Sequence, residues 1–259
     1  VGCSANTTGF VYQRYDPTVV SLQTEVCEGQ SVNLSVNSAS AVSYLWSSNA
    51  ANATTSSVSV HPSFPSSTYS VTVTNNLGCT SVPTANINVI ARPVINITGN
   101  DSICIGATTT LSPSLGGSWV SYNPSVATIT NAGVVTAISA GNATFAFYDN
   151  TSTCTSVAST PITVNPKPTV SITGSAAICV GTTTSLSPST GGTWISSDDN
   201  IASVENNGIV TGVNEGNATF IFTSSSTDCL SDPTAAINVD GEEGISITGD
   251  NSLCIGEST

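Results

Sequence analysis

The sequence predicts an all-β protein made of tandem immunoglobulin-like β-sandwich repeats stacked end to end as a rod. Three observations predict this fold: a set of motifs recurs every 75 residues, apolar and polar residues alternate within short segments, and no segment shows the apolar stripe of a helix. The composition agrees, because Ser, Thr, Val, Asn, Ala and Gly dominate and only 7% of the residues are charged.

The repeat is the strongest of these signals. The segment that begins Ile97-Thr98-Gly99 recurs at Ile172 and again at Ile247. The same register aligns Cys104-Ile105-Gly106 with Cys179-Val180-Gly181 and Cys254-Ile255-Gly256, Gly116-Gly117-Ser118-Trp119 with Gly191-Gly192-Thr193-Trp194, Gly141–Phe145 with Gly216–Phe220, and Cys154 with Cys229. Chance does not produce so many matches in one register.

A more diverged copy precedes these two, with Cys27, Trp46 and Cys79 in corresponding places. We therefore expect five segments: the C-terminal remnant of a preceding repeat at 1–22, full repeats at 23–91, 92–166 and 167–241, and the start of a further repeat at 242–259. Because both ends fall inside a repeat, the chain is expected to be a window of a longer array.

Within each copy, the strand signal is period-2 alternation bounded by Gly, Pro, Asn and Asp, as in Thr219–Thr223 and Ala236–Val239. About seven short strands, a mid-repeat tryptophan and frequent turn signals describe a small immunoglobulin-like sandwich. Trp46, Trp119 and Trp194 recur with the repeat and are expected to fill the three cores. Exposed aromatic rings that bind sugars are the alternative.

Residues 95–239 resemble two copies of the group 2 bacterial immunoglobulin-like domain, on the Gly-Gly-Thr-Trp motif, Gly208–Gly212 and Gly216-Asn217-Ala218-Thr219. Residues 23–90 resemble PKD-like modules of very large Bacteroidota surface proteins, on Cys-Glu-Gly at Cys27, Tyr44 and Trp46, and Asn-Leu-Gly-Cys at Cys79. The resemblance implies a giant secreted adhesin of the bacterial cell surface, of the kind that gliding cells move along their surface, exported by the type IX system. It also implies O-glycosylation at Ser102, within Asp101-Ser102-Ile103; a turn-forming Asp-Ser is the alternative.

Charge narrows the set of partners. The chain has 16 acidic and 3 basic residues, for a net charge of −13, so nucleic acid and anionic membrane surfaces are not expected as partners. No apolar run is long enough to cross a bilayer, so no membrane insertion is expected in this window. Acidic turns such as Asp198-Asp199-Asn200 could collect calcium ligands, but solvated turns explain them more simply, and no metal or cofactor is predicted.

The three basic residues all lie at junctions between repeats: Arg14 before Asp16-Pro17, Arg92 before Pro93, and Lys167 before Pro168. Proline stiffens a short linker, and each cation could pair with an acid of the neighbouring repeat, such as Asp101. A solvated charge is the equal alternative. The junction at 240–244 has two glycines and no proline or cation, so more bending is expected there.

Eight cysteines at repeating positions, without zinc or redox spacing, indicate disulfides formed in an oxidising, extracellular compartment. Three pairing schemes respect the period. The intra-repeat scheme joins Cys27 to Cys79, Cys104 to Cys154 and Cys179 to Cys229. The inter-repeat scheme joins Cys27 to Cys154 and Cys104 to Cys229, and leaves Cys3, Cys79, Cys179 and Cys254 for repeats outside the chain. The third joins Cys79 to Cys104 and Cys154 to Cys179.

Geometry ranks these schemes. In an immunoglobulin-like sandwich, the Cys-x-Gly cysteine precedes the second strand and the other cysteine follows the sixth, so the two lie at opposite ends of one repeat. Bridged Cα atoms must lie within about 7 Å. Stacked repeats bring one end of each repeat to the opposite end of the next, which favours the inter-repeat scheme, with the intra-repeat scheme second.

No catalytic constellation is apparent, and an enzyme is not predicted. His61 is the single histidine, in the diverged repeat alone, and bridged cysteines cannot act as nucleophiles. The function expected is therefore a structural stalk of a large secreted adhesin or filament, with neighbouring repeats of the same chain as its partners and an unknown surface or glycan ligand elsewhere in the protein. The alternatives are repeats that bind glycans or a partner surface themselves, and non-catalytic spacers of a secreted enzyme.

Overall fold

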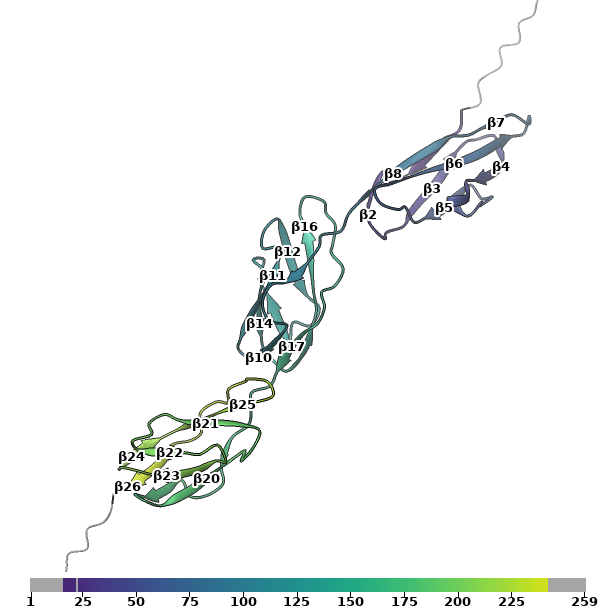
Figure 1. Cartoon of the computed structure of the whole chain (residues 1–259). Coiled ribbons are helices and arrows are strands. Elements are labelled where there is room, and N and C mark those ends of the chain that lie inside the picture. The colour runs from purple at the N-terminus through teal and green to yellow at the C-terminus, as the bar shows by residue number, and fades with distance from the viewer. Residues whose placement is uncertain (1–15, 22, 242–259) are drawn as a thin grey trace, which may run out of the picture.

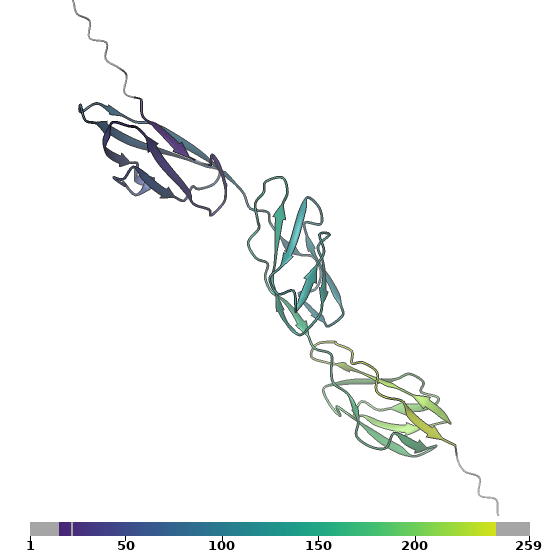
Figure 2. The ribbon, with the colours of Figure 1, turned by 180° about the vertical axis from the view of Figure 1, so that it is seen from behind.

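The computed structural model describes residues 16–21 and 23–241. Three β-sandwiches follow one another along an elongated chain, and the two opposite views agree on this arrangement (Figures 1 and 2). The first sandwich holds β1 to β8, the second β9 to β17 and the third β18 to β26; we call them repeats 1, 2 and 3. The tandem all-β architecture predicted from the sequence is confirmed.

Repeat 1 contains eight strands and one short 3-10 helix, η1 (Ser48–Ala50), which lies between β4 and β5. Its strands are β1 (Thr18–Ser21), β2 (Glu25–Cys27), β3 (Val32–Asn37), β4 (Ala41–Trp46), β5 (Ser57–Val60), β6 (Ser66–Asn75), β7 (Thr80–Ser81) and β8 (Thr84–Ile90). One sheet has the order β1-β3-β5 and the other the order β2-β8-β6-β4.

Repeats 2 and 3 each contain nine strands, which are equivalent and follow in the same order. Repeat 2 contains β9 (Asn96–Ile97), β10 (Ser102–Cys104), β11 (Thr108–Ser112), β12 (Gly117–Ser121), β13 (Ala127–Ile129), β14 (Val134–Ala137), β15 (Gly141–Ala143), β16 (Phe145–Asp149) and β17 (Ile162–Asn165). Repeat 3 contains β18 (Ser171–Ile172), β19 (Ala177–Cys179), β20 (Thr183–Ser187), β21 (Gly192–Ser196), β22 (Ala202–Val204), β23 (Ile209–Gly212), β24 (Gly216–Ala218), β25 (Phe220–Ser224) and β26 (Ile237–Asp240).

The predicted count of about seven strands is too low because two strands are interrupted. β9 pairs with β11 in one sheet, whereas β10 pairs in parallel with β17 in the other, so the chain changes sheets between them. Likewise β15 pairs with β17, while β16, which begins two residues later, pairs with β12. At each interruption, the two halves of one strand pair with different neighbouring strands.

The predicted boundary between residues 22 and 23 is wrong. β1 pairs along its whole length with β3, from Thr18 opposite Asn37 to Ser21 opposite Leu34, so it belongs to repeat 1 and not to a preceding repeat. It takes the place that β9 takes beside β11. Its sequence lacks the Ile-Thr-Gly motif that marks the first strand of the other repeats, so the repeat signal missed it.

Each sandwich has its own core, centred on a tryptophan. Trp46, Trp119 and Trp194 are 1%, 8% and 5% exposed, which makes them core residues rather than a sugar-binding surface. Each indole nitrogen donates to a backbone carbonyl, of Thr55, Pro113 and Pro188 respectively. The Trp119 ring lies edge-on to Phe147 with 5.1 Å between ring centroids, an arrangement that aromatic pairs prefer.

The Gly-Gly-x-Trp motif has a packing reason. Gly116 has φ +87°, a conformation that favours glycine. A Cβ on Gly117 would clash with the Tyr148 carbonyl oxygen and the Phe147 ring. The second glycine therefore lets β12 approach β16 closely enough for Trp119 to reach Phe147.

Among the described residues, no helix is long and apolar enough to cross a membrane.

Candidate functional site: the stapled junctions between repeats

The last strand of each repeat ends beside a Cys-x-Gly turn, at what we call the exit end of the repeat. Cys27 pairs with Ile90, Cys104 with Asn165 and Cys179 with Asp240, each across a parallel strand pair. In every turn the cysteine carbonyl accepts a hydrogen bond from the amide three residues later, at Gln30, Ala107 and Thr182, at 2.9–3.0 Å. The glycine between them has positive φ, at Gly29, Gly106 and Gly181, as a type II turn requires.

The other cysteine of each repeat lies in a loop at the opposite, entry end. The cysteine carbonyl accepts a hydrogen bond from the amide at the end of the preceding long strand: Asn75 to Cys79, Asp149 to Cys154 and Ser224 to Cys229, each at 3.0 Å. The residue before each cysteine has positive φ: Gly78, Thr153 and Asp228. All three entry loops therefore hold their cysteine by the same backbone arrangement, although the loops of repeats 2 and 3 are one residue longer.

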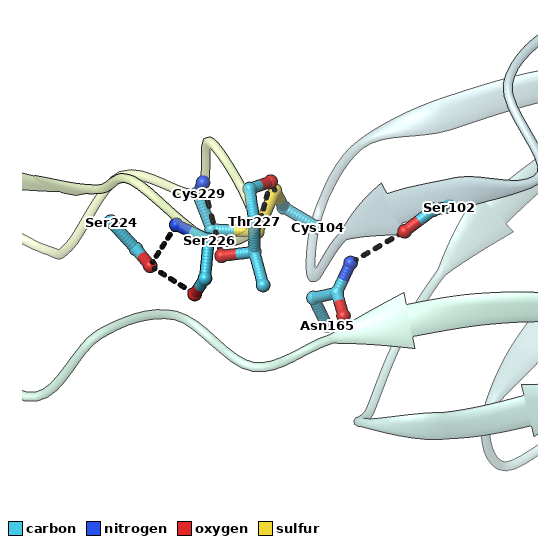
Figure 3. Close-up of a disulfide and its surroundings, with 7 residues drawn as sticks. All are labelled: Ser102, Cys104, Asn165, Ser224, Ser226, Thr227 and Cys229. Carbon is cyan, nitrogen blue, oxygen red and sulfur yellow. Dashed lines mark hydrogen bonds between the residues drawn. A yellow bond between two sulfur atoms is a disulfide. The ribbon is translucent and has the colours of Figure 1, made fainter. Parts of the chain in front are cut away.

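Two disulfides cross the two junctions between repeats. Cys27 at the exit end of repeat 1 is bonded to Cys154 in the entry loop of repeat 2, with 5.7 Å between Cα atoms. Cys104 at the exit end of repeat 2 is bonded to Cys229 in the entry loop of repeat 3, with 5.6 Å between Cα atoms. We call these bridges staples. Figure 3 shows the second, with the Cys104 sulfur 4.0 Å from the Thr227 carbonyl oxygen.

The structure thus contains the inter-repeat pairs and not those of the other two schemes. Cys79 and Cys179 are both unbridged and exposed, whereas Cys154 and Cys229 are completely buried. Cys3 and Cys254 lie outside the described residues. The physical reason is the one that ranks the schemes: the two cysteines of one repeat lie at opposite ends of it, and stacking brings unlike ends together.

Each described junction cation ties its linker to a segment next to a staple, but not through the expected partner. The Arg92 Nε donates to the Glu28 carbonyl at 2.6 Å, directly after Cys27. The Lys167 ammonium forms a salt bridge with Asp232, three residues after Cys229. Asp101, the example suggested by the sequence, pairs with neither. Arg14 and the linker beyond Gly241 lie outside the described residues.

A groove of about 830 Å³ opens at the junction between repeats 1 and 2. Its walls come from Glu28 and Gly29, from the linker and β9, and from the segment after the entry loop. None of its lining residues is aromatic: Glu28, Gly29, Arg92, Pro93, Val94, Ile95, Asn96, Ile97, Val157, Ala158, Ser159 and Thr160. At the next junction, Asp232 of repeat 3 occupies the position equivalent to the exposed Val157 of repeat 2. Lys167 forms its salt bridge with this Asp232.

One ionisable group in the stapled loops has a shifted pKa. The Thr151 amide donates to the Asp149 carboxylate at 2.9 Å, and Ser152 donates its hydroxyl at 2.8 Å. These bonds, that of the Thr151 backbone first, lower the pKa of Asp149 below its ordinary value. Asn75 accepts equivalent amide bonds from Leu77 and Cys79 in repeat 1. This turn-capping position was missed from the sequence; its signal was an Asn, Asp or Ser four or five residues before the cysteine.

The remaining predicted residues lie apart from the staples or beside them. Ser102 is exposed and its hydroxyl accepts a 2.8 Å hydrogen bond from the Asn165 amide, close to the second staple (Figure 3). Asp198 caps its own turn by accepting from the Asn200 backbone at 2.9 Å. Among the described residues, no cluster of three or more His, Cys, Asp or Glu side chains could hold a metal ion.

Comparison with protein families gives one match: residues 158–232 match the bacterial Ig-like domain (group 2). The matched span is one period long and is shifted by nine residues from the predicted 167–241 repeat, so it includes β17 and stops before β26. A search of curated protein sequences finds no match.

Solved structures with similar arrangements include invasin, a bacterial integrin-binding protein, at 17% identity and a TM-score of 0.34, with 86% of this chain and 58% of that chain covered. Domains 1–6 of the surface layer protein SbsC match at 17% identity and a TM-score of 0.25, covering 91% of this chain. This chain spans only 42% of that surface layer protein. Three N-terminal domains of the bacteriophage RB49 outer capsid protein Hoc match at 9% identity and a TM-score of 0.31, covering 89% and 100%.

These structures are too distant to bear on function. The fold, the family match over residues 158–232 and the staples together describe tandem Ig-like repeats of a secreted or extracellular protein.

Proposed function

We propose that this chain is a stiff segment of an extracellular stalk that holds an adhesive part of a larger bacterial cell-surface protein or filament away from its anchor. The observation that carries the proposal is the pair of staples, one across each described junction. At each junction, two consecutive repeats are therefore joined at two separate points, by the peptide linker and by the disulfide. Bending at the linker alone would pull the bridged Cα atoms out of the range that a disulfide permits.

The linker contacts support the same role. Arg92 fixes the first linker to repeat 1, and Lys167 fixes the second linker to repeat 3. An exposed ion pair such as that of Lys167 with Asp232 contributes only about 0–1 kcal/mol, and the Arg92 contact is an exposed hydrogen bond to a backbone carbonyl. These contacts therefore orient the linkers, and the covalent staples supply the resistance to bending. The net charge of −13 adds repulsion between neighbouring stalks on a crowded surface.

Small-angle X-ray scattering of the full chain tests this proposal. The reference protein carries serine at Cys3, Cys79, Cys179 and Cys254, so that only the staples remain. We expect it to give a narrow distribution of extended shapes. Adding Cys27→Ser with Cys154→Ser, and then Cys104→Ser with Cys229→Ser, should broaden the distribution and lower the mean maximum dimension stepwise, while circular dichroism stays unchanged. Identical scattering with and without the staples would overturn the proposal.

A second candidate is binding of a partner protein surface by the repeats themselves. The groove between repeats 1 and 2 favours it, because Val94 and Val157 are 77% and 64% exposed there. The absence of aromatic rings from its lining favours a protein over a glycan as the ligand. A Val94→Asp, Val157→Asp double variant should lose adhesion to a purified ligand while keeping its scattering profile; retained adhesion would exclude this groove.

A further inference from the structure

We propose that the groove between repeats 1 and 2 binds the carboxyl terminus of an extended, aliphatic polypeptide segment, which adds to the free edge of β9 and places its terminal carboxylate at Arg92. The inference rests on the second candidate function and deepens it, because it names the chemistry of the partner that the groove fits. Three features of the groove carry it: a cation without an acid, aliphatic side chains on two walls, and backbone groups available to a further strand.

Arg92 lies at one end of the groove without an acidic partner. Its Nε donates to the Glu28 carbonyl and one terminal nitrogen lies beside Gly29, but it forms no salt bridge among the described residues. The equivalent cation of the next junction, Lys167, does form one, with Asp232. A guanidinium has five N–H donors suited to carboxylates. The first junction therefore holds a cation for which the described chain supplies no carboxylate.

The walls of the groove are aliphatic where the equivalent surfaces of the second junction are polar. Val94 and Val157, on different walls, are 77% and 64% exposed. In the register of the repeat they correspond to Thr169 and Asp232. The same substitution of polar by aliphatic on two facing segments favours a ligand with aliphatic side chains.

Backbone groups on both walls are available to an extended chain. β9 is the last strand of its sheet. Leu111, which lies opposite Ile97, donates its amide to Gly133 and so points away from β9. Opposed residues of such an antiparallel pair both point outward, so Ile97 directs its N–H and C=O to the free edge. On the other wall, the amides of Val157 and Ala158 form no hydrogen bond within the described residues.

The position of Arg92 sets the direction of the ligand. Arg92 precedes β9 in the chain, so a ligand whose carboxyl terminus lies at Arg92 runs antiparallel to Val94–Ile97. Four extended residues span about 13 Å at about 3.4 Å each, so a tetrapeptide matches this stretch. Strand addition of this kind takes its affinity from main-chain hydrogen bonds and its specificity from the alternate side chains and the captured terminus.

The probe is the N-acetylated tetrapeptide Thr-Val-Thr-Val with a free carboxyl terminus. It is titrated into the isotopically labelled full-length reference protein of the scattering test and followed by nuclear magnetic resonance. We expect amide shifts confined to the groove, at Ile97, Val157 and Ala158. The same peptide with an amidated terminus should bind about tenfold more weakly, because it lacks the charge-assisted hydrogen bonds to Arg92. Octanoate, a carboxylate without peptide groups, should not displace the peptide.

Matched variants identify the cation that binds the carboxylate. Arg92→Gln should weaken binding of the carboxylate peptide about tenfold and leave binding of the amidated peptide unchanged. Lys167→Gln at the second junction is the control and should change neither. Val157→Asp gives the first junction the acid that the second has at Asp232, so it should weaken the carboxylate peptide more than the amidated one.

Equal affinity of the two peptides, amide shifts outside the groove, displacement by octanoate, or no binding at all would overturn the inference. An equal effect of Arg92→Gln on both peptides would overturn it as well. The adhesion test of the Val94→Asp, Val157→Asp double variant then tells the two failures apart. Loss of adhesion means that the groove binds a partner of other chemistry, whereas retained adhesion excludes the groove. The scattering test of the staples depends on neither result.

Discussion

Cys27 and Cys154 are 127 positions apart in the chain, yet their Cα atoms lie 5.7 Å apart and their sulfurs are bonded across the junction between repeats 1 and 2. The second staple, between Cys104 and Cys229, begins inside the span of the first. The two covalent loops therefore overlap between Cys104 and Cys154. This overlap changes the route by which tension crosses repeat 2.

Pulling on the chain ends should unfold repeat 2 with a shortened extension while the staples are intact. The shortest covalent route then runs from Cys27 to Cys154, back along 50 residues to Cys104, and across to Cys229. At about 3.4 Å per residue this releases at most about 170 Å, against about 255 Å for the 75-residue period. Single-molecule force spectroscopy before and after reduction measures both; equal steps would contradict the overlapping-loop route.

Thr153→Gly should stabilise repeat 2 by about 1 kcal/mol, because a β-branched residue at φ +58° carries backbone strain that glycine lacks. Asp228→Gly at the equivalent position of repeat 3 is the matched control. Its gain should be smaller, since aspartate tolerates this region better than threonine. Chemical unfolding measures both variants, and an equal or larger gain at Asp228 would show that the strain is not specific to threonine.

Acidification should loosen the first staple before the second. The carboxylate of Asp149 has a lowered pKa in the fold, so its stabilisation of the entry loop is present at neutral pH and is lost as the pH falls through the ordinary aspartate value near 4 and below it. The equivalent residue beside the second staple is Ser224, which does not titrate in this range.

The reduction rate of the first staple divided by that of the second, both measured with a phosphine reductant across this pH range, should therefore rise as the pH falls. The Asp149→Asn variant removes the titrating group and is the control. A ratio that changes with pH as strongly in this variant would exclude Asp149 as the cause.

Gly117→Ala should destabilise repeat 2 by about 1–3 kcal/mol, because the added Cβ would clash with the Tyr148 carbonyl and the Phe147 ring. Gly241→Ala is the control, since a Cβ there meets only the end of the Glu215 side chain at 3.3 Å. The fluorescence of Trp119 during chemical unfolding measures the loss of stability of repeat 2 in the Gly117→Ala variant. Tolerance of Gly117→Ala would mean that β12 can move away from β16 without cost.

Sequence periodicity by itself determined the repeats, the strand pattern and the positions of the cysteines and core tryptophans, because alternation and spacing are local properties that recur with the fold. It did not place β1 in repeat 1, since that strand is recognised by its pairing with β3 and not by a repeat motif. Likewise, the partner of Lys167 depends on which acid the loop after Cys229 brings near, and that is Asp232.

Only the tertiary structure decided which surfaces meet. The backbone hydrogen bond and the positive φ that hold the cysteine in each entry loop and each Cys-x-Gly turn are set locally, and they are present whether the cysteine is bridged or free. The burial of Cys154 and Cys229, the groove beside Arg92 and the exposure of Cys79 and Cys179 all depend on whether another repeat lies against that end. Contacts between separately folded units are set by how their ends pack, which no pattern within one unit encodes.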